Sequence, residues 1–115
     1  MLEGFRTIVA ECKYRQPIDG VQHGGQYIAN TFNLNVRDKI EESLFNGVNG
    51  TNNNGYHMLS KSILNQQKHG KTLLLGGDHS VGISSLDAML ELYGENLRVL
   101  WIDAHADIND YKHSI

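Results

Sequence analysis

The chain has 115 residues, a formal net charge of −3 and 40% hydrophobic residues. This length suits one modest domain and is too short for two. The charge is mild and the basic residues are scattered singly, which argues against a nucleic-acid partner and against binding to an anionic membrane.

The N-terminal segment predicts a strand over Thr7–Cys12. Cys12 is the only cysteine, and its apolar surroundings favour a buried structural thiol over a reactive one. A single cysteine cannot form an internal disulfide, so we expect a reducing compartment. No secretory signal is visible, and no run reaches the roughly 20 apolar residues needed to span a bilayer. The expected location is therefore cytoplasmic.

The middle of the chain carries weaker patterns. Residues 16–25 are polar, bear glycines and contain the only proline, which predicts a loop. Apolar residues spaced by four then predict an amphipathic helix over Gln26–Phe45. The segment Asn46–Gly55 is rich in asparagine and glycine and predicts an exposed loop.

The second half alternates helices and short apolar strands. Helices are predicted over Tyr56–His69 and Val81–Tyr93, each followed by a glycine. Strands are predicted over Thr72–Leu75 and Val99–Ile102, and both are apolar on both faces, as in a parallel sheet covered by helices. The order helix–strand–helix–strand predicts an α/β fold in which a parallel sheet is flanked by helices.

Polar clusters follow both of the later strands. Gly76-Gly77-Asp78-His79-Ser80 comes directly after the first, and Asp103-Ala104-His105-Ala106-Asp107 after the second. Ligands bind at the carboxyl edge of open parallel sheets. A single-helix crossover usually brings its two strands side by side or nearly so. We therefore expect His79 and Asp103 to reach one point in space.

The second cluster predicts a divalent metal. In an extended segment Asp103, His105 and Asp107 point to the same side. Grouped carboxylates raise one another's pKa unless a cation offsets their charge. Imidazole with several carboxylates suits manganese, iron or zinc, and the carboxylate-rich set favours manganese. Asp78 is better interpreted as a helix cap or as support for a neighbouring ligand than as a ligand itself.

The two clusters resemble the N-terminal signature motifs of the ureohydrolase superfamily, which comprises arginase, agmatinase, formimidoylglutamase and relatives. Their order and spacing match, as does the apolar strand before each. Ile108-Asn109 resembles the arginase branch in particular. The loop His23–Gln26 resembles an early glycine-bearing loop of the family more weakly. Tyr27–Ala29 replaces the usual Gly-Pro, and the acidic second-strand element that usually follows is hard to find.

The resemblance implies an arginase-like three-layer α/β/α fold, with residues 1–115 forming the N-terminal part of a single catalytic domain. It implies a site with two manganese ions. His79 and Asp107 would bind the first ion and His105 the second, and Asp103 would bridge both. Asn109 would contact the α-carboxylate of the substrate.

The implied reaction is hydrolysis of the guanidinium group of L-arginine to L-ornithine and urea. Two metals that share one water lower its pKa and hold hydroxide in line with the guanidinium carbon. The implied partners are a small guanidino substrate and, for the complete protein, further copies of itself. The family's later Asp-x-Asp ligands and its shuttle histidine lie downstream, and the context of His113 does not match that histidine. The alternatives are another ureohydrolase, acting on agmatine or guanidinobutyrate, and a truncated inactive relative.

Overall fold

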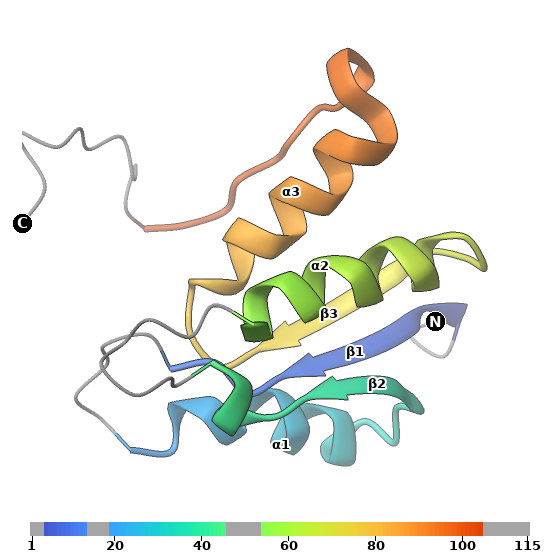
Figure 1. The fold of residues 1–115 in the computed structure, drawn as a ribbon. Coiled ribbons are helices and arrows are strands. Elements are labelled where there is room, and N and C mark those ends of the chain that lie inside the picture. Colours follow the sequence, from blue (N-terminus) through green and yellow to red (C-terminus); the bar gives the residue numbers. More distant parts are fainter. Residues whose placement is uncertain (1–3, 14–18, 46–53, 105–115) are drawn as a thin grey trace, which may run out of the picture.

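The computed structural model of the chain describes residues 4–13, 19–45 and 54–104. In these residues three parallel strands form one sheet in the order β2-β1-β3 (Figure 1). The strands are β1 (Arg6–Ala10), β2 (Val36–Ile40) and β3 (Thr72–Gly76). The α-helices are α1 (Gly24–Thr31), α2 (Asn54–Gln67) and α3 (Val81–Tyr93), and short 3-10 helices lie at Val21–His23, Glu42–Leu44 and Gly94–Asn96.

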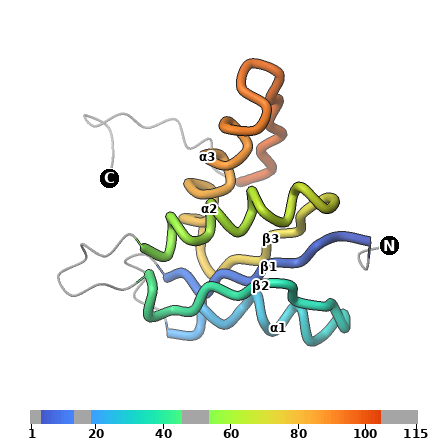
Figure 2. Tube along the Cα trace, turned by 45° about the vertical axis from the view of Figure 1, so that its right-hand side comes forward, coloured from blue at the N-terminus to red at the C-terminus, as the bar shows by residue number. Residues whose placement is uncertain are grey.

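The helices cover both faces of the sheet. α1 packs under β1 and β3, while α2 lies across the opposite face (Figures 1 and 2). α3 packs on α2 and projects away from the sheet. The predicted fold class, a parallel sheet flanked by helices, is confirmed. None of the helices in the described residues is long and apolar enough to cross a lipid bilayer.

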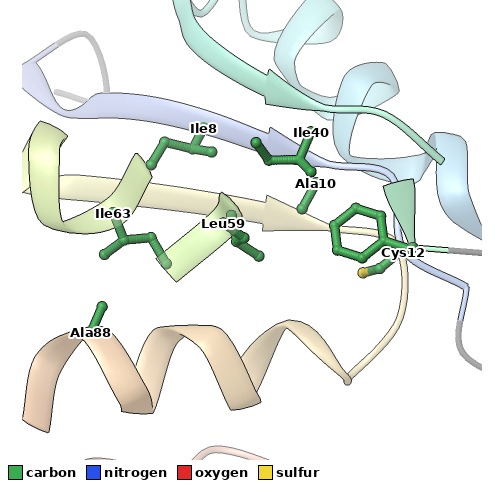
Figure 3. Packing of buried hydrophobic residues seen from close by; sticks show 8 residues of the cluster. Ile8, Ala10, Cys12, Ile40, Leu59, Ile63 and Ala88 are labelled. Atoms are coloured by element: carbon green, nitrogen blue, oxygen red, sulfur yellow. The ribbon is translucent and has the colours of Figure 1, made fainter. Parts of the chain in front are cut away.

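The core lies between β1 and the α2–α3 layer. β1 is the central strand, and Ile8, Val9 and Ala10 are fully buried because helices cover both faces of the sheet. Figure 3 shows Ile8 and Ala10 on the face that meets Leu59 and Ile63 of α2. This packing fixes the position at which β1 and its neighbour β3 end, and therefore the edge from which the polar loops emerge.

The predicted helix over Gln26–Phe45 is wrong after Thr31. α1 already begins at Gly24, inside the predicted loop, and the chain then turns through Asn33, whose φ is 53°. It continues as β2, in which Val36–Ile40 alternates between more buried and more exposed side chains. A spacing of four is also a multiple of two, so the same apolar residues fit one face of a strand. β2 is thus the second-strand element that the sequence did not reveal.

The predicted strand over Val99–Ile102 is also wrong in the described part of the chain. These residues are not in the sheet, and β3 pairs with β1 alone among the described strands. The segment runs back past α3 instead (Figure 1). A strand requires ladder hydrogen bonds to a neighbour, and an apolar run by itself cannot supply them. Exposed fractions of 86% for Leu100 and 88% for Ile102 follow from this position.

The remaining elements match their predictions closely. α3 has the predicted bounds, β3 extends one residue further to Gly76, and α2 begins at Asn54 rather than at Tyr56. Gly70 and Gly94, which follow the two predicted helices, have φ values of 155° and 51°. Both values favour glycine. Gly94 directly follows the last residue of α3, whereas α2 already ends at Gln67 rather than at the predicted His69, and a short turn leads from it to Gly70. Most of the predicted loop over residues 46–55 lies outside the described residues.

Candidate metal centre

His79 lies in the tight turn between β3 and α3. Gly77 donates a backbone hydrogen bond to the carbonyl of Ala10 (3.1 Å), and Asp78 donates one to the carbonyl of Cys12 (3.2 Å). A Cβ on Gly77 would lie 2.1 Å from the Cys12 carbonyl oxygen and 2.8 Å from the Cα of Gln22. Only glycine fits this approach, because both neighbours are backbone atoms. The turn that carries His79 is therefore held against the end of β1.

Cys12 lies beneath this turn. Its side chain is fully buried, and Sγ lies 3.7 Å from the carbonyl oxygen of Asp78, to which it donates a weak hydrogen bond. Burial raises the pKa of the thiol, and hydrogen bonds with the backbone of Asp78 and Gly77 offset part of that effect. The predicted buried structural thiol is confirmed.

A chain of side-chain hydrogen bonds braces the turn from the side of α2. The Asp78 carboxylate accepts hydrogen bonds from the backbone N–H of Ser80 (3.1 Å) and from its hydroxyl (2.5 Å). The hydroxyl of Tyr56 donates to Ser80 Oγ at 2.7 Å. Ser80 precedes α3 without a side-chain cap hydrogen bond. These contacts agree with the interpretation of Asp78 as a supporting residue.

The structure brings His79 and Asp103 together. Nδ1 of His79 lies 3.3 Å from Oδ2 of Asp103, and the carboxylate is largely buried, with 17% of its side chain exposed. The two residues come from the β3–α3 turn and from the extended segment after α3. The predicted convergence is present, although Asp103 does not follow a strand of the described sheet. The route differs from the prediction because α3 and its returning segment carry Asp103 back to the turn.

Trp101 also meets His79, and the sequence reasoning missed it. The indole and imidazole rings stack with centroids 4.9 Å apart and planes inclined by 20°. The signal for this contact was available, because residues 101 and 103 lie on the same side of an extended segment. The apolar run around Trp101 instead favours a buried strand, in which the indole would pack between sheet and helix and not on His79.

The donor chemistry of this pair fits a divalent cation. Two ligand atoms bound side by side to one ion at about 2.1 Å each lie about 3 Å apart, close to the separation of His79 Nδ1 and Asp103 Oδ2. An imidazole nitrogen and a carboxylate oxygen are both common ligands of such ions. Within residues 4–13, 19–45 and 54–104 no cluster of three or more His, Cys, Asp or Glu side chains could hold an ion. His105, Asp107 and Asn109 lie outside the described residues.

Comparisons with known proteins agree with the motifs. The model of the Arginase family matches residues 14–114. An arginase of Emericella nidulans is 48% identical over 56 residues, which cover 44% of this chain and 17% of that protein. An arginase of Plasmodium falciparum is 37% identical over 84 residues, covering 73% and 18%, and one of Staphylococcus aureus is 54% identical over 37 residues, covering 32% and 12%.

The matched part of this chain thus spans less than a fifth of the length of these relatives. No solved structure gave a significant match. The family model, in contrast, covers most of the chain, including both polar clusters and the turn and segment that bring His79 and Asp103 together. The chain therefore belongs to the arginase family.

Proposed function

We propose that this chain supplies the N-terminal half of the metal centre of a manganese-dependent arginase, which hydrolyses L-arginine to L-ornithine and urea. The contact between His79 and Asp103, made in a chain of the arginase family, carries this proposal. His79, Asp103, His105 and Asp107 would hold two manganese ions, and Asn109 would bind the substrate's α-carboxylate.

The residues of this chain would hold and orient the reacting groups. When bound, two manganese ions supply an activated water for attack on the guanidinium carbon. His79 and Asp103 present a nitrogen and an oxygen ligand at one place, and the hydrogen bonds from Tyr56 through Ser80 to Asp78 hold the turn that positions His79. Such supporting contacts commonly change metal affinity by about 10–100-fold.

A hybrid enzyme tests the proposal. Residues 14–114, which the family model matches, would replace the N-terminal segment of the Emericella nidulans arginase around the 56 residues that align with this chain. Urea release from arginine would be measured with manganese. We expect activity in the hybrid and a loss of roughly 100-fold or more in His79→Ala and Asp103→Asn. His69→Ala, in the exposed turn after α2, is the matched histidine control and should be unchanged. Equal activity in all variants would refute the assigned ligands.

The same hybrid separates the alternatives. A ureohydrolase specific for another guanidine would release urea from agmatine or guanidinobutyrate in preference to arginine. An inactive relative would give a folded hybrid that releases no urea from any of them. The nucleotide sequence beyond the codon for Ile115 gives an independent check, since an in-frame continuation with an Asp-x-Asp pair would favour the enzyme.

The partners and location remain part of this proposal. A small guanidino compound would be the substrate, and the complete protein would be a homo-oligomer, which light scattering after size-exclusion chromatography can test. A cytoplasmic location is supported by the lone cysteine, which is a buried thiol and forms no disulfide. Fluorescent tagging of the complete protein would test that location.

A further inference from the structure

Trp101 occupies a defined place between the metal-ligand pair and α3. Its ring stacks on the imidazole of His79 with a centroid separation of 4.9 Å. The far edge of the same indole lies over Gly82 in the first turn of α3, where an added Cβ would be 3.5 Å from Trp101 Cη2. The indole thus contacts both the turn that carries His79 and the helix that follows it.

The exposed fractions of residues 100–103 alternate along the extended segment that carries Trp101. Leu100 and Ile102 are 86% and 88% exposed, whereas Trp101 is 44% exposed and the side chain of Asp103 is 17% exposed. Alternate side chains of an extended segment point to opposite sides. Trp101 and Asp103 therefore lie on the same side of the segment and both face His79, Trp101 against the ring face and Asp103 at Nδ1.

A histidine ring needs such a contact to keep one orientation. Rotation about χ2 of histidine has broad minima, and 56% of the His79 side chain is exposed. A flat aromatic neighbour limits the ring to orientations parallel to itself, because offset stacking is favourable and edge clashes are not. The indole therefore keeps the imidazole in its observed plane. Within that plane the contact with Asp103 selects the flip in which Nδ1, and not Cδ2, faces the carboxylate.

We propose that Trp101 is a positioning residue of the metal centre, which holds the imidazole plane of His79 so that Nδ1 points to the ion shared with Asp103. This inference rests on the proposed metal-binding role of His79. The stack itself is independent of any metal and can be tested separately. Trp101 is the only tryptophan in the chain, so its fluorescence reports on this place alone.

The first test measures the stack in the metal-free chain. An indole shifts the NMR signals of ring protons stacked on it to higher field. We expect such a shift for His79, assigned with His79→Gln, in the parent chain and in Leu100→Ala. Trp101→Phe should keep part of the shift, and Trp101→Ala should remove it. Ordinary His79 shifts in the parent, or unchanged shifts in Trp101→Ala, would overturn the inference.

The second test measures Mn²⁺ affinity in every variant from the electron paramagnetic resonance signal of free Mn²⁺. In the chains that retain Trp101, quenching of its emission gives a second measurement. We expect Trp101→Ala to weaken binding roughly three- to tenfold, and Trp101→Phe to restore most of it. Leu100→Ala, which truncates an exposed apolar neighbour, should bind as the parent does. Equal weakening in Leu100→Ala and Trp101→Ala would overturn the inference. A parent chain that shows the ring shift but binds no Mn²⁺, or a His79→Gln chain that binds it unchanged, would refute the proposed metal role while leaving the stack established.

Discussion

At the level of single residues, Cys12 shows how the turn that carries His79 depends on a buried group beneath it. Its thiol donates to the carbonyl of Asp78, and the Cys12 carbonyl accepts from the N–H of Asp78, so both sides of this contact hold the turn. Burial raises the pKa of the thiol above its ordinary value of 9.0. The thiolate would be a charge beside Asp78 in a site shielded from water.

The raised pKa predicts a loss of stability in alkali. The folded chain retains the thiol proton to a higher pH than the unfolded chain does. The free energy of unfolding should therefore fall as the pH rises from about 9 through the folded pKa. Urea denaturation at pH 7 and pH 10 would measure this fall. Cys12→Ala should be less stable at pH 7 but show a smaller fall, and equal falls in both chains would contradict the prediction.

Asn109 gives a prediction about substrate choice under the proposed function. Arginine carries an α-carboxylate and agmatine does not, and a site built around a hydrogen bond penalises a substrate that lacks the partner. In the hybrid, Asn109→Ala should lower kcat/KM for arginine by roughly ten- to a hundredfold and change that for agmatine little. Equal losses for both substrates would show that Asn109 does not recognise the carboxylate.

At the scale of elements, the packing of α1 on β3 depends on a glycine. A Cβ added to Gly25 would lie 2.6 Å from the carbonyl oxygen of Leu75 and 3.3 Å from the Cβ of Leu75. The neighbouring Gly24 has nothing within 4 Å of the same position. The two glycines therefore have different roles, although they stand side by side in the sequence.

Alanine at these two positions should have opposite effects. Gly25→Ala forces α1 away from β3 and should destabilise the fold by about 1–3 kcal/mol, as overpacked substitutions do. Gly24→Ala adds a better helix former in open space and should be neutral or stabilising by up to about 1 kcal/mol. Thermal unfolding of both variants gives the comparison. Similar destabilisation in both would contradict the close approach of α1 to the sheet.

The link between α2 and the His79 turn predicts a second element-level effect. Tyr56→Phe removes the hydrogen bond to Ser80 and keeps the ring that packs edge-on against Phe45. We expect a loss of about 0.5–1.5 kcal/mol of stability and weaker Mn²⁺ binding. Tyr93→Phe removes an exposed hydrogen bond from Gln67 and should change neither quantity measurably. Calorimetry of both variants, with and without Mn²⁺, would measure their stability and their Mn²⁺ binding. Identical results for the two variants would argue that the hydrogen bond from Tyr56 to Ser80 does not support the His79 turn.

For the molecule as a whole, the described residues form one sheet with a helical layer on each face (Figure 1). The contact between His79 and Asp103 lies just beyond the carboxyl end of β3. The chain matches less than a fifth of the length of its curated relatives. By resemblance, the later carboxylate ligands belong to the part that these residues do not include. A dinuclear site without them would hold its second ion weakly.

We therefore predict that the purified 115-residue chain releases little or no urea from arginine, even with excess manganese. A colorimetric urea assay measures this release directly, and the hybrid enzyme, assayed under the same conditions, is the positive control. Sustained urea release by the chain alone, abolished in His79→Ala, would show that the N-terminal half-site is sufficient and would refute the prediction.

The features that depend on local patterns could be predicted from the amino-acid sequence. Apolar residues at helical spacing predicted α3, and a continuous apolar run predicted β3, each with a glycine at its end. Helix ends and buried strands are encoded within a few residues, so both could be recognised locally. The glycine-rich turn with His79, and the alternating acidic cluster that begins at Asp103, could be recognised for the same reason. Cys12 could be placed in the core from its apolar neighbours alone.

The features that depend on pairing between distant segments follow from the fold and could not be predicted from local patterns. Apolar residues spaced by four fit both a helix and a strand, and β2 became a strand because β1 offered it a hydrogen-bonding edge. The segment from Val99 to Ile102 has strand composition but runs back past α3, so no ladder forms with β3. The stack of Trp101 on His79 follows from that path. The periodicity of a sequence predicts which side chains lie on the same face of a segment. Which residues that face then contacts depends on how the rest of the chain folds around it.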